Sequence, residues 1–179
     1  MTGSGYALAG AAFFLAVAPG PTFAQDAPKP VAVYTAWSVY VWDNPKECAL
    51  VSAPAESVNT RDGKPVAVRR GEIRLFVTYR PGAAQGEISF AGGYPFAPDS
   101  SPTLDIGGTV FNLFTDAATN PENAWSNSPE DDAKIIAAMK AGSSAILSAR
   151  SQRGTQTKDT FSLNGASAAL DEAAKRCAG

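Results

Sequence analysis

Short runs of alternating apolar and polar residues, each ended by Gly or Pro, recur along most of this 179-residue chain. The clearest is IRLFVTYR at residues 73–80, where four apolar or aromatic side chains share one face before Pro81-Gly82 ends the run. Period-two alternation is typical of a half-buried strand, and Gly and Pro supply the turns. The spacing of these runs predicts a mainly β, single-domain fold, either an antiparallel β-sandwich or a barrel-like sheet.

Two segments carry helix signals, at about 128–141 and 166–177. Ser128 stands at a capping position ahead of a proline, and Lys140 lies near the expected C-terminus, where the helix dipole favours positive charge. The second segment, ASAALDEAAKRC, is rich in Ala and ends at Cys177. We therefore expect two short α-helices beside the sheet.

An acidic run, Glu130-Asp131-Asp132, opens the first of these helices. Consecutive carboxylates on a helix point in different directions, so they are poorly arranged for a metal site or an acid–base pair. Negative charge near a helix N-terminus is stabilised by the dipole. We interpret the run as a capping and dipole feature, with Asp132 at an edge near solvent.

The first 24 residues contain no charged side chain and have the pattern of a secretory signal peptide. The apolar run Tyr6–Ala18 is too short for a membrane span, and Thr22-Phe23-Ala24 fits a cleavage site. The segment departs from the usual pattern in lacking Lys or Arg before the apolar run. We expect removal of residues 1–24, a flexible lead-in at 25–35 and one domain at 36–179. The protein would then be periplasmic, or secreted or surface-associated, with no integral membrane span.

Two cysteines, Cys48 and Cys177, lie near opposite ends of the exported part of the chain. In an oxidising compartment an isolated pair usually forms a disulfide. The alternative is two free thiols, one of them reactive, but a reactive thiol needs an electropositive setting that these residues do not show.

The chain contains no histidine. This excludes Ser-His-Asp and Cys-His catalysis in their usual forms and removes the commonest zinc and copper ligand. A formal charge of −2 and a pI near 5.1 argue against a nucleic-acid partner, which would require a basic face. We expect no catalytic residues, no metal and no cofactor.

Three side chains are candidates for ligand binding: Arg80, Tyr94 and Trp125. Arginines on an amphipathic strand, such as Arg80, are more often part of a solvated face. Tyr94 and Trp125 belong to loop-like segments, where exposed aromatics bind well, but the favoured interpretation of Tyr94 is that it packs inward over one end of the core. Arg69-Arg70 is too short a run to indicate a binding patch.

The segment RSQRGTQTKDTFSLNGASAAL at 150–170 is dense in residues that can do chemistry. Thr155 and Lys158 have the spacing of a nucleophile and its base on a helix, but this segment alternates like a strand, which places them on opposite faces. We interpret it as a hairpin turn at Arg153-Gly154, a strand, and a break at Asn164-Gly165. One face of that strand should carry Thr157, Asp159, Phe161 and Leu163.

The chain resembles the invasion-associated locus B (IalB) family of exported bacterial proteins. The matching elements span residues 37–177 and are WSVYV, ECALVSAP, LFVTYRP, GEIS, GYPF, FNLFTD, the AW pair at 124–125, IIAAMKAG, SQRGTQTKDTFSLNG and ALDEAAKRC. The resemblance implies a periplasmic or surface-exposed, mostly β protein with a name linked to host-cell entry. It implies a cysteine pair at Cys48 and Cys177, and no catalytic residues.

These observations favour a non-catalytic exported envelope or cell-surface protein that binds an envelope or host-surface component, protein or glycan, through its loops. The alternative is a periplasmic hydrolase that acts through paired carboxylates. Glycoside chemistry would need two such groups facing each other about 5–10 Å apart.

Overall fold

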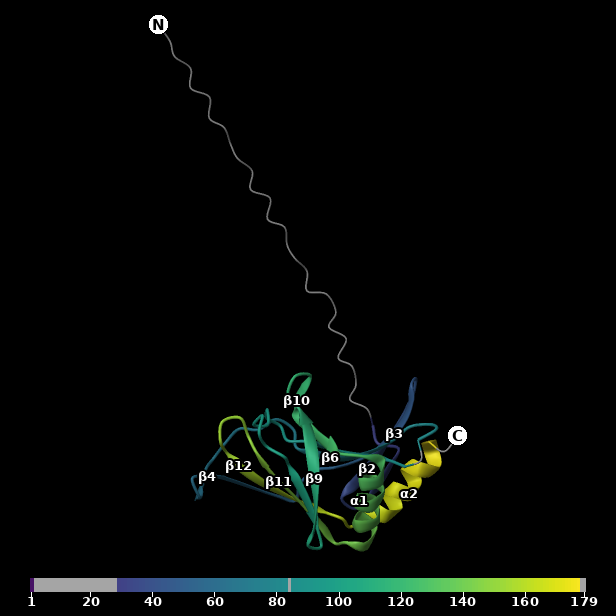
Figure 1. Ribbon diagram of the computed structural model, residues 1–179. Helices are drawn as coiled ribbons and strands as arrows, with labels where there is room; N and C mark the ends of the chain where they lie inside the picture. Colours follow the sequence, from purple (N-terminus) through teal and green to yellow (C-terminus); the bar gives the residue numbers. More distant parts are fainter. Residues whose placement is uncertain (2–28, 84, 178–179) are drawn as a thin grey trace.

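The computed structural model describes Met1, residues 29–83 and residues 85–177. Twelve strands and two helices lie in this part of the chain (Figure 1). The strands are β1 (Ala32–Tyr34), β2 (Trp37–Asp43), β3 (Lys46–Ser52), β4 (Glu56–Arg61), β5 (Lys64–Pro65), β6 (Arg74–Tyr79), β7 (Glu87–Ala91), β8 (Thr103–Ile106), β9 (Thr109–Asp116), β10 (Asn120–Ser126), β11 (Ser144–Arg150) and β12 (Gln156–Ser162). The helices are α1 (Pro129–Ala141) and α2 (Ala166–Cys177).

All strand pairs are antiparallel and follow the order β1-β2-β3-β6-β7-β10-β9-β8-β11-β12-β4-β5. Strand β9 joins two portions of the sheet, because its first half pairs with β8 and its second half with β10. The end strands β1 and β5 do not pair with each other, so the sheet is not closed into a barrel. The prediction of a mainly β antiparallel domain with two short helices is confirmed.

The two portions of the sheet pack against each other through buried side chains. The Trp37 indole Nε1 on β2 donates a hydrogen bond to the carbonyl of Ser162 on β12, at 3.0 Å. Phe90 on β7 meets Phe161 on β12 edge to face, with ring centroids 6.3 Å apart. Because these contacts link strands far apart in the sheet order, the interior is one shared hydrophobic core.

Strand β12 follows the alternation expected from its sequence. The residues predicted to share one face are all buried, and Lys158 between them is exposed. The turn Ser151–Thr155 precedes the strand, with the amide of Gly154 bonded to the Ser151 carbonyl, as predicted for Arg153-Gly154. This segment is therefore the hairpin strand between β11 and β4, not a helical nucleophile site.

Helix α1 begins as its sequence predicts, with the Ser128 side chain accepting a hydrogen bond from the Asp131 amide at 3.2 Å. The interpretation of Asp132 as a residue near solvent was wrong. Asp132 is 6 % exposed, and its carboxylate accepts hydrogen bonds from the Ile88 amide, at 2.8 Å, and from the Ser126 hydroxyl. Burial raises the pKa of Asp132, and these two hydrogen bonds oppose the increase. Asp132 thus ties α1 to β7 and β10.

Helix α2 packs its Ala- and Leu-bearing face against β2 and β3. The two helices lie together beside β2 and β3, and β4, β11 and β12 lie on the opposite side (Figure 1). The last residue of α2 forms the disulfide Cys48–Cys177, with an S–S distance of 2.03 Å and a Cα–Cα distance of 5.9 Å. The predicted pairing is confirmed, and both described cysteines are engaged in it.

Strand β1 falls within residues 25–35, which the sequence led us to expect as a flexible lead-in. It pairs with β2, from Ala32 opposite Val39 to Tyr34 opposite Trp37, so the folded part extends into that range. The predicted signal peptide lies, apart from Met1, outside the described residues. None of the helices in the described part of the chain is long and apolar enough to cross a membrane.

Candidate functional site

A cavity of about 530 Å³ lies where β4, the β11–β12 turn, the segment before β6 and the loop after β7 meet. We call it the arginine pocket, because four of its lining residues are Arg61, Arg69, Arg70 and Arg153. Its volume lies within the range of small-molecule sites, about 300–1,000 Å³. The pocket thus brings together residues from 61–70, 93–95 and 151–157 with Glu122 of β10.

The loop after β7 is fixed on both sides, which gives the pocket a rigid wall. The Phe96 amide donates to the carbonyl of Pro121 at 2.8 Å, and the Gln152 amide donates to the carbonyl of Pro95 at 2.9 Å. Gly93 has a positive φ of 70°, and a Cβ there would lie 2.7 Å from the Gly71 carbonyl oxygen. Only glycine fits this close approach of two backbones without strain.

The floor of the pocket contains a buried ion pair between Arg70 and Asp159. Two parallel hydrogen bonds of 2.7 Å join the guanidinium to the carboxylate, whose side chains are 6 % and 0 % exposed. Arg70 also donates to the Gly92 carbonyl at 2.8 and 3.1 Å and lies 4.9 Å from the centroid of the Tyr94 ring. Because Asp159 neutralises Arg70, this arginine adds little net charge to the pocket. It instead holds the Gly92 carbonyl and the Tyr94 ring in place.

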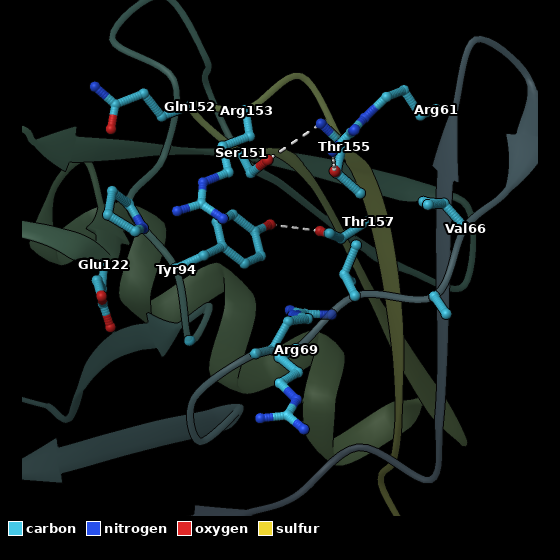
Figure 2. A pocket seen from close by; sticks show the side chains of 15 residues that line it. Arg61, Val66, Arg69, Tyr94, Glu122, Ser151, Gln152, Arg153, Thr155 and Thr157 are labelled. Atoms are coloured by element: carbon cyan, nitrogen blue, oxygen red, sulfur yellow. Dashed lines mark hydrogen bonds between the residues drawn. The ribbon is translucent and has the colours of Figure 1, made fainter.

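Hydroxyl groups line the floor beside this pair. The Tyr94 and Thr157 hydroxyl oxygens are 2.5 Å apart, and Thr157 Oγ1 reaches the Ala149 carbonyl at 3.4 Å. Arg61 donates to the Thr155 hydroxyl at 2.8 Å (Figure 2). Burial raises the pKa of Tyr94, and its hydrogen bond to Thr157 and the nearby Arg70 charge partly offset this. Tyr94 therefore remains a neutral phenol at physiological pH.

Three arginines, Arg61, Arg69 and Arg153, form the exposed rim of the pocket. Among the described residues, none of the three has a carboxylate within salt-bridge distance. Figure 2 shows Arg61 and Arg153 on one side of the Tyr94–Thr157 hydrogen bond and Arg69 on the other. The lining contains one carboxylate, Glu122. A protein with a net charge of −2 thus carries a positively charged pocket.

A second cavity, of about 400 Å³, lies beside the N-terminus of α1. Trp125 lines it and stacks on Phe114 with ring centroids 5.6 Å apart, and the lining carboxylates are Glu87, Asp116 and Asp132. Asp116 accepts hydrogen bonds from the Thr119 hydroxyl and from the amides of Thr119 and Ala118, and these bonds lower its pKa. The Glu87 carboxylate lies 3.4 Å from a guanidinium nitrogen of Arg80. Each carboxylate therefore has a structural partner. The described residues hold no cluster of three or more potential metal ligands.

The structure separates the three binding residues predicted from the sequence. Tyr94 lines the arginine pocket and Trp125 lines the second cavity. Arg80 lies outside both, just beyond β6, in ion pairs with Glu47 at 2.9 Å and Glu87 at 3.4 Å. The binding roles of these three residues remain predictions.

Sequence reasoning missed the arginines of the pocket. Arg69 and Arg70 looked too few to form a patch, but the fold adds Arg61 from β4 and Arg153 from the β11–β12 turn. The available signal was the position of each beside a loop or turn, such as Arg61 before Asp62-Gly63 and Arg153 before a glycine. That signal does not indicate which loops meet.

The comparisons with known proteins agree on one family and one fold. A family model described as "Invasion associated locus B (IalB) protein" matches residues 43–174. The crystal structure of invasion associated protein b from Bartonella henselae is similar, with a TM-score of 0.57 and 15 % sequence identity, over 80 % of this chain and 95 % of that chain. At this identity the likeness shows the fold alone. A search of curated proteins found no match.

Proposed function

The chain belongs to the invasion-associated locus B family, and on this basis we propose that it is an exported, non-catalytic envelope or cell-surface protein that binds an anionic component in the arginine pocket. The leader-like residues 1–24 support export. The disulfide supports an oxidising compartment, because such bonds persist in the periplasm and outside the cell.

The observation that carries this proposal is the set of three rim arginines around one cavity. A guanidinium presents a planar fork of N–H donors that matches a carboxylate, sulfate or phosphate group. The fork of Arg70 is occupied by Asp159, and those of Arg69 and Arg153 have no such partner among the described residues. A rigid floor reduces the entropic cost of binding, since the donors are already in place.

Binding fits this chain better than hydrolysis. The alternative, a periplasmic hydrolase with paired carboxylates, would use the second cavity, where Glu87, Asp116 and Asp132 gather. Asp132 and Asp116 already accept hydrogen bonds from backbone amides. Such hydrogen bonds favour the charged form of a carboxylate, and they lower the pKa of Asp116, which makes it a poor proton donor.

We expect the processed protein, which lacks residues 1–24, to sediment with envelope fragments of the producing bacterium or with animal-cell membranes. This binding should depend on the arginine pocket. Replacing two of the three rim arginines, by Arg69→Gln and Arg153→Gln, should weaken this binding at least about tenfold, because each charge-assisted hydrogen bond contributes about 1.5–3 kcal/mol. Co-sedimentation at low and at physiological salt measures the effect and its screening.

The matched control is Lys175→Gln with Arg176→Gln, which removes the same charge at two exposed positions of α2 that line neither cavity. It should bind like the unaltered protein. An equal loss in both double variants would show that net charge governs binding, and the pocket proposal would be wrong.

A further inference from the structure

We propose that the arginine pocket takes an acidic saccharide, a sugar unit that carries a carboxylate, sulfate or phosphate. This inference rests on the proposed anion-binding function and specifies its ligand class. The charge distribution, the floor and the walls of the pocket each support it.

The charges of the pocket are mixed rather than uniformly positive. Arg61, Arg69 and Arg153 supply donors for an anion, and Glu122 lies on the opposite side of the pocket from Arg61 (Figure 2). A carboxylate accepts hydrogen bonds only, so it repels a second anionic group and attracts hydroxyl donors. The ligand that satisfies both sides has an anionic group at one end and hydroxyl groups at the other.

The floor offers the remaining contacts that a sugar uses. The half-buried Tyr94 ring lies against Arg70, 4.9 Å from the ring centroid, and against Phe96, with ring centroids 5.2 Å apart, and the contact of its hydroxyl with Thr157 fixes the ring in the floor. Gln152 adds an amide with both donor and acceptor atoms. A cavity of about 530 Å³ is of the size that holds a ligand of one or a few rings.

Part of the wall is closed to an extended peptide because its backbone amides are already paired. Strand addition requires a row of unpaired backbone groups, whereas the amides of Val66, Gly71 and Gln152 already donate to the carbonyls of Asn59, Gly93 and Pro95. The side chains of the pocket supply most of its further donors and acceptors, which favours a compact ligand rich in hydroxyl groups over a peptide main chain.

The test is calorimetric titration of the processed protein with four probes: digalacturonate, its neutral dimethyl ester, tetraglutamate and inorganic phosphate. Digalacturonate should bind at least about tenfold more tightly than the ester and than tetraglutamate, because only it offers both an anion and hydroxyl groups. The variant Arg69→Gln with Arg153→Gln should lose this difference, and Lys175→Gln with Arg176→Gln should keep it. A sulfated and a phosphorylated disaccharide, as further arms, identify the acidic group.

Each other outcome has a distinct meaning. Tetraglutamate binding as tightly as digalacturonate would overturn the saccharide inference and leave the anion-binding function standing. Equal affinities for digalacturonate and its neutral ester would contradict the role of the arginines in recognising an anionic group. Failure of all anionic probes, phosphate included, would overturn both the inference and the proposed function. Unchanged thermal unfolding of the variants ensures that these results report binding.

Discussion

Replacing Arg70 by methionine is expected to lower the free energy of unfolding by about 3–5 kcal/mol, since removing one partner of a buried ion pair leaves an uncompensated charge. The partner, Asp159, is 0 % exposed and would keep a single side-chain hydrogen bond, from Ser57 at 2.7 Å. Denaturant unfolding followed by tryptophan fluorescence, with the disulfide intact, measures the change.

The neighbouring residue provides a matched control, because Arg69→Met makes the same change at an exposed position. It should alter stability by no more than about 0.5 kcal/mol. The combination of Arg70→Met with Asp159→Asn should cost less than the sum of the single changes, since the two residues are coupled. Equal stabilities for Arg70→Met and Arg69→Met would contradict a buried, stabilising pair.

Removing the disulfide by Cys48→Ala with Cys177→Ala should lower the free energy of unfolding by about 2–5 kcal/mol. The bridge joins residues 129 positions apart, so it restricts most of the domain in the unfolded chain. It also fixes the end of α2 to β3. Chemical unfolding of the variant and of the unaltered oxidised protein gives the difference.

The unaltered protein in reductant should unfold like the double variant, which separates loss of the bond from loss of the cysteine side chains. Mass spectrometry of the exported protein should find one peptide pair joined through Cys48 and Cys177, with no free thiol at either. Free thiols at both positions, or a double variant as stable as the oxidised protein, would contradict this account.

The fold was largely predictable because its signals are local. The cap at Ser128, the proline after it and the glycine after the last turn set the bounds of α1 without reference to the rest of the chain. Strand β12 shows its buried face through alternation alone. The two portions of the sheet and their join at β9 depend on strand pairing, which these patterns do not encode.

The candidate site was less predictable because its contacts are long-range. Arg69 and Arg70 are adjacent, yet one lies at the rim and the other is buried against Asp159, 89 positions away. Helix periodicity places Asp132 on the side of the apolar stripe, where we expected an edge near solvent, and only the packing of α1 on β7 reveals its burial. Local charge patterns thus identify residue types but not the surfaces that the fold brings together.

The family relationship supplies the fold and a name, and the chemistry comes from this chain's own residues. With 15 % identity to the Bartonella henselae protein, no individual side-chain role carries over. The arginine pocket is inferred from its own geometry: three exposed guanidinium groups, a rigid floor and a loop held by paired backbone groups.

The most direct test of the central claim is an NMR titration of the ¹⁵N-labelled processed protein with inorganic phosphate, which needs no assumption about the natural ligand. We expect shifts in the amides of Tyr94, Arg153 and Thr155 and in the side-chain Nε–Hε of Arg69, and no shifts around Trp125. The variant Arg69→Gln with Arg153→Gln should remove them. Shifts confined to the second cavity, or no shifts at millimolar phosphate, would contradict an anion-binding arginine pocket.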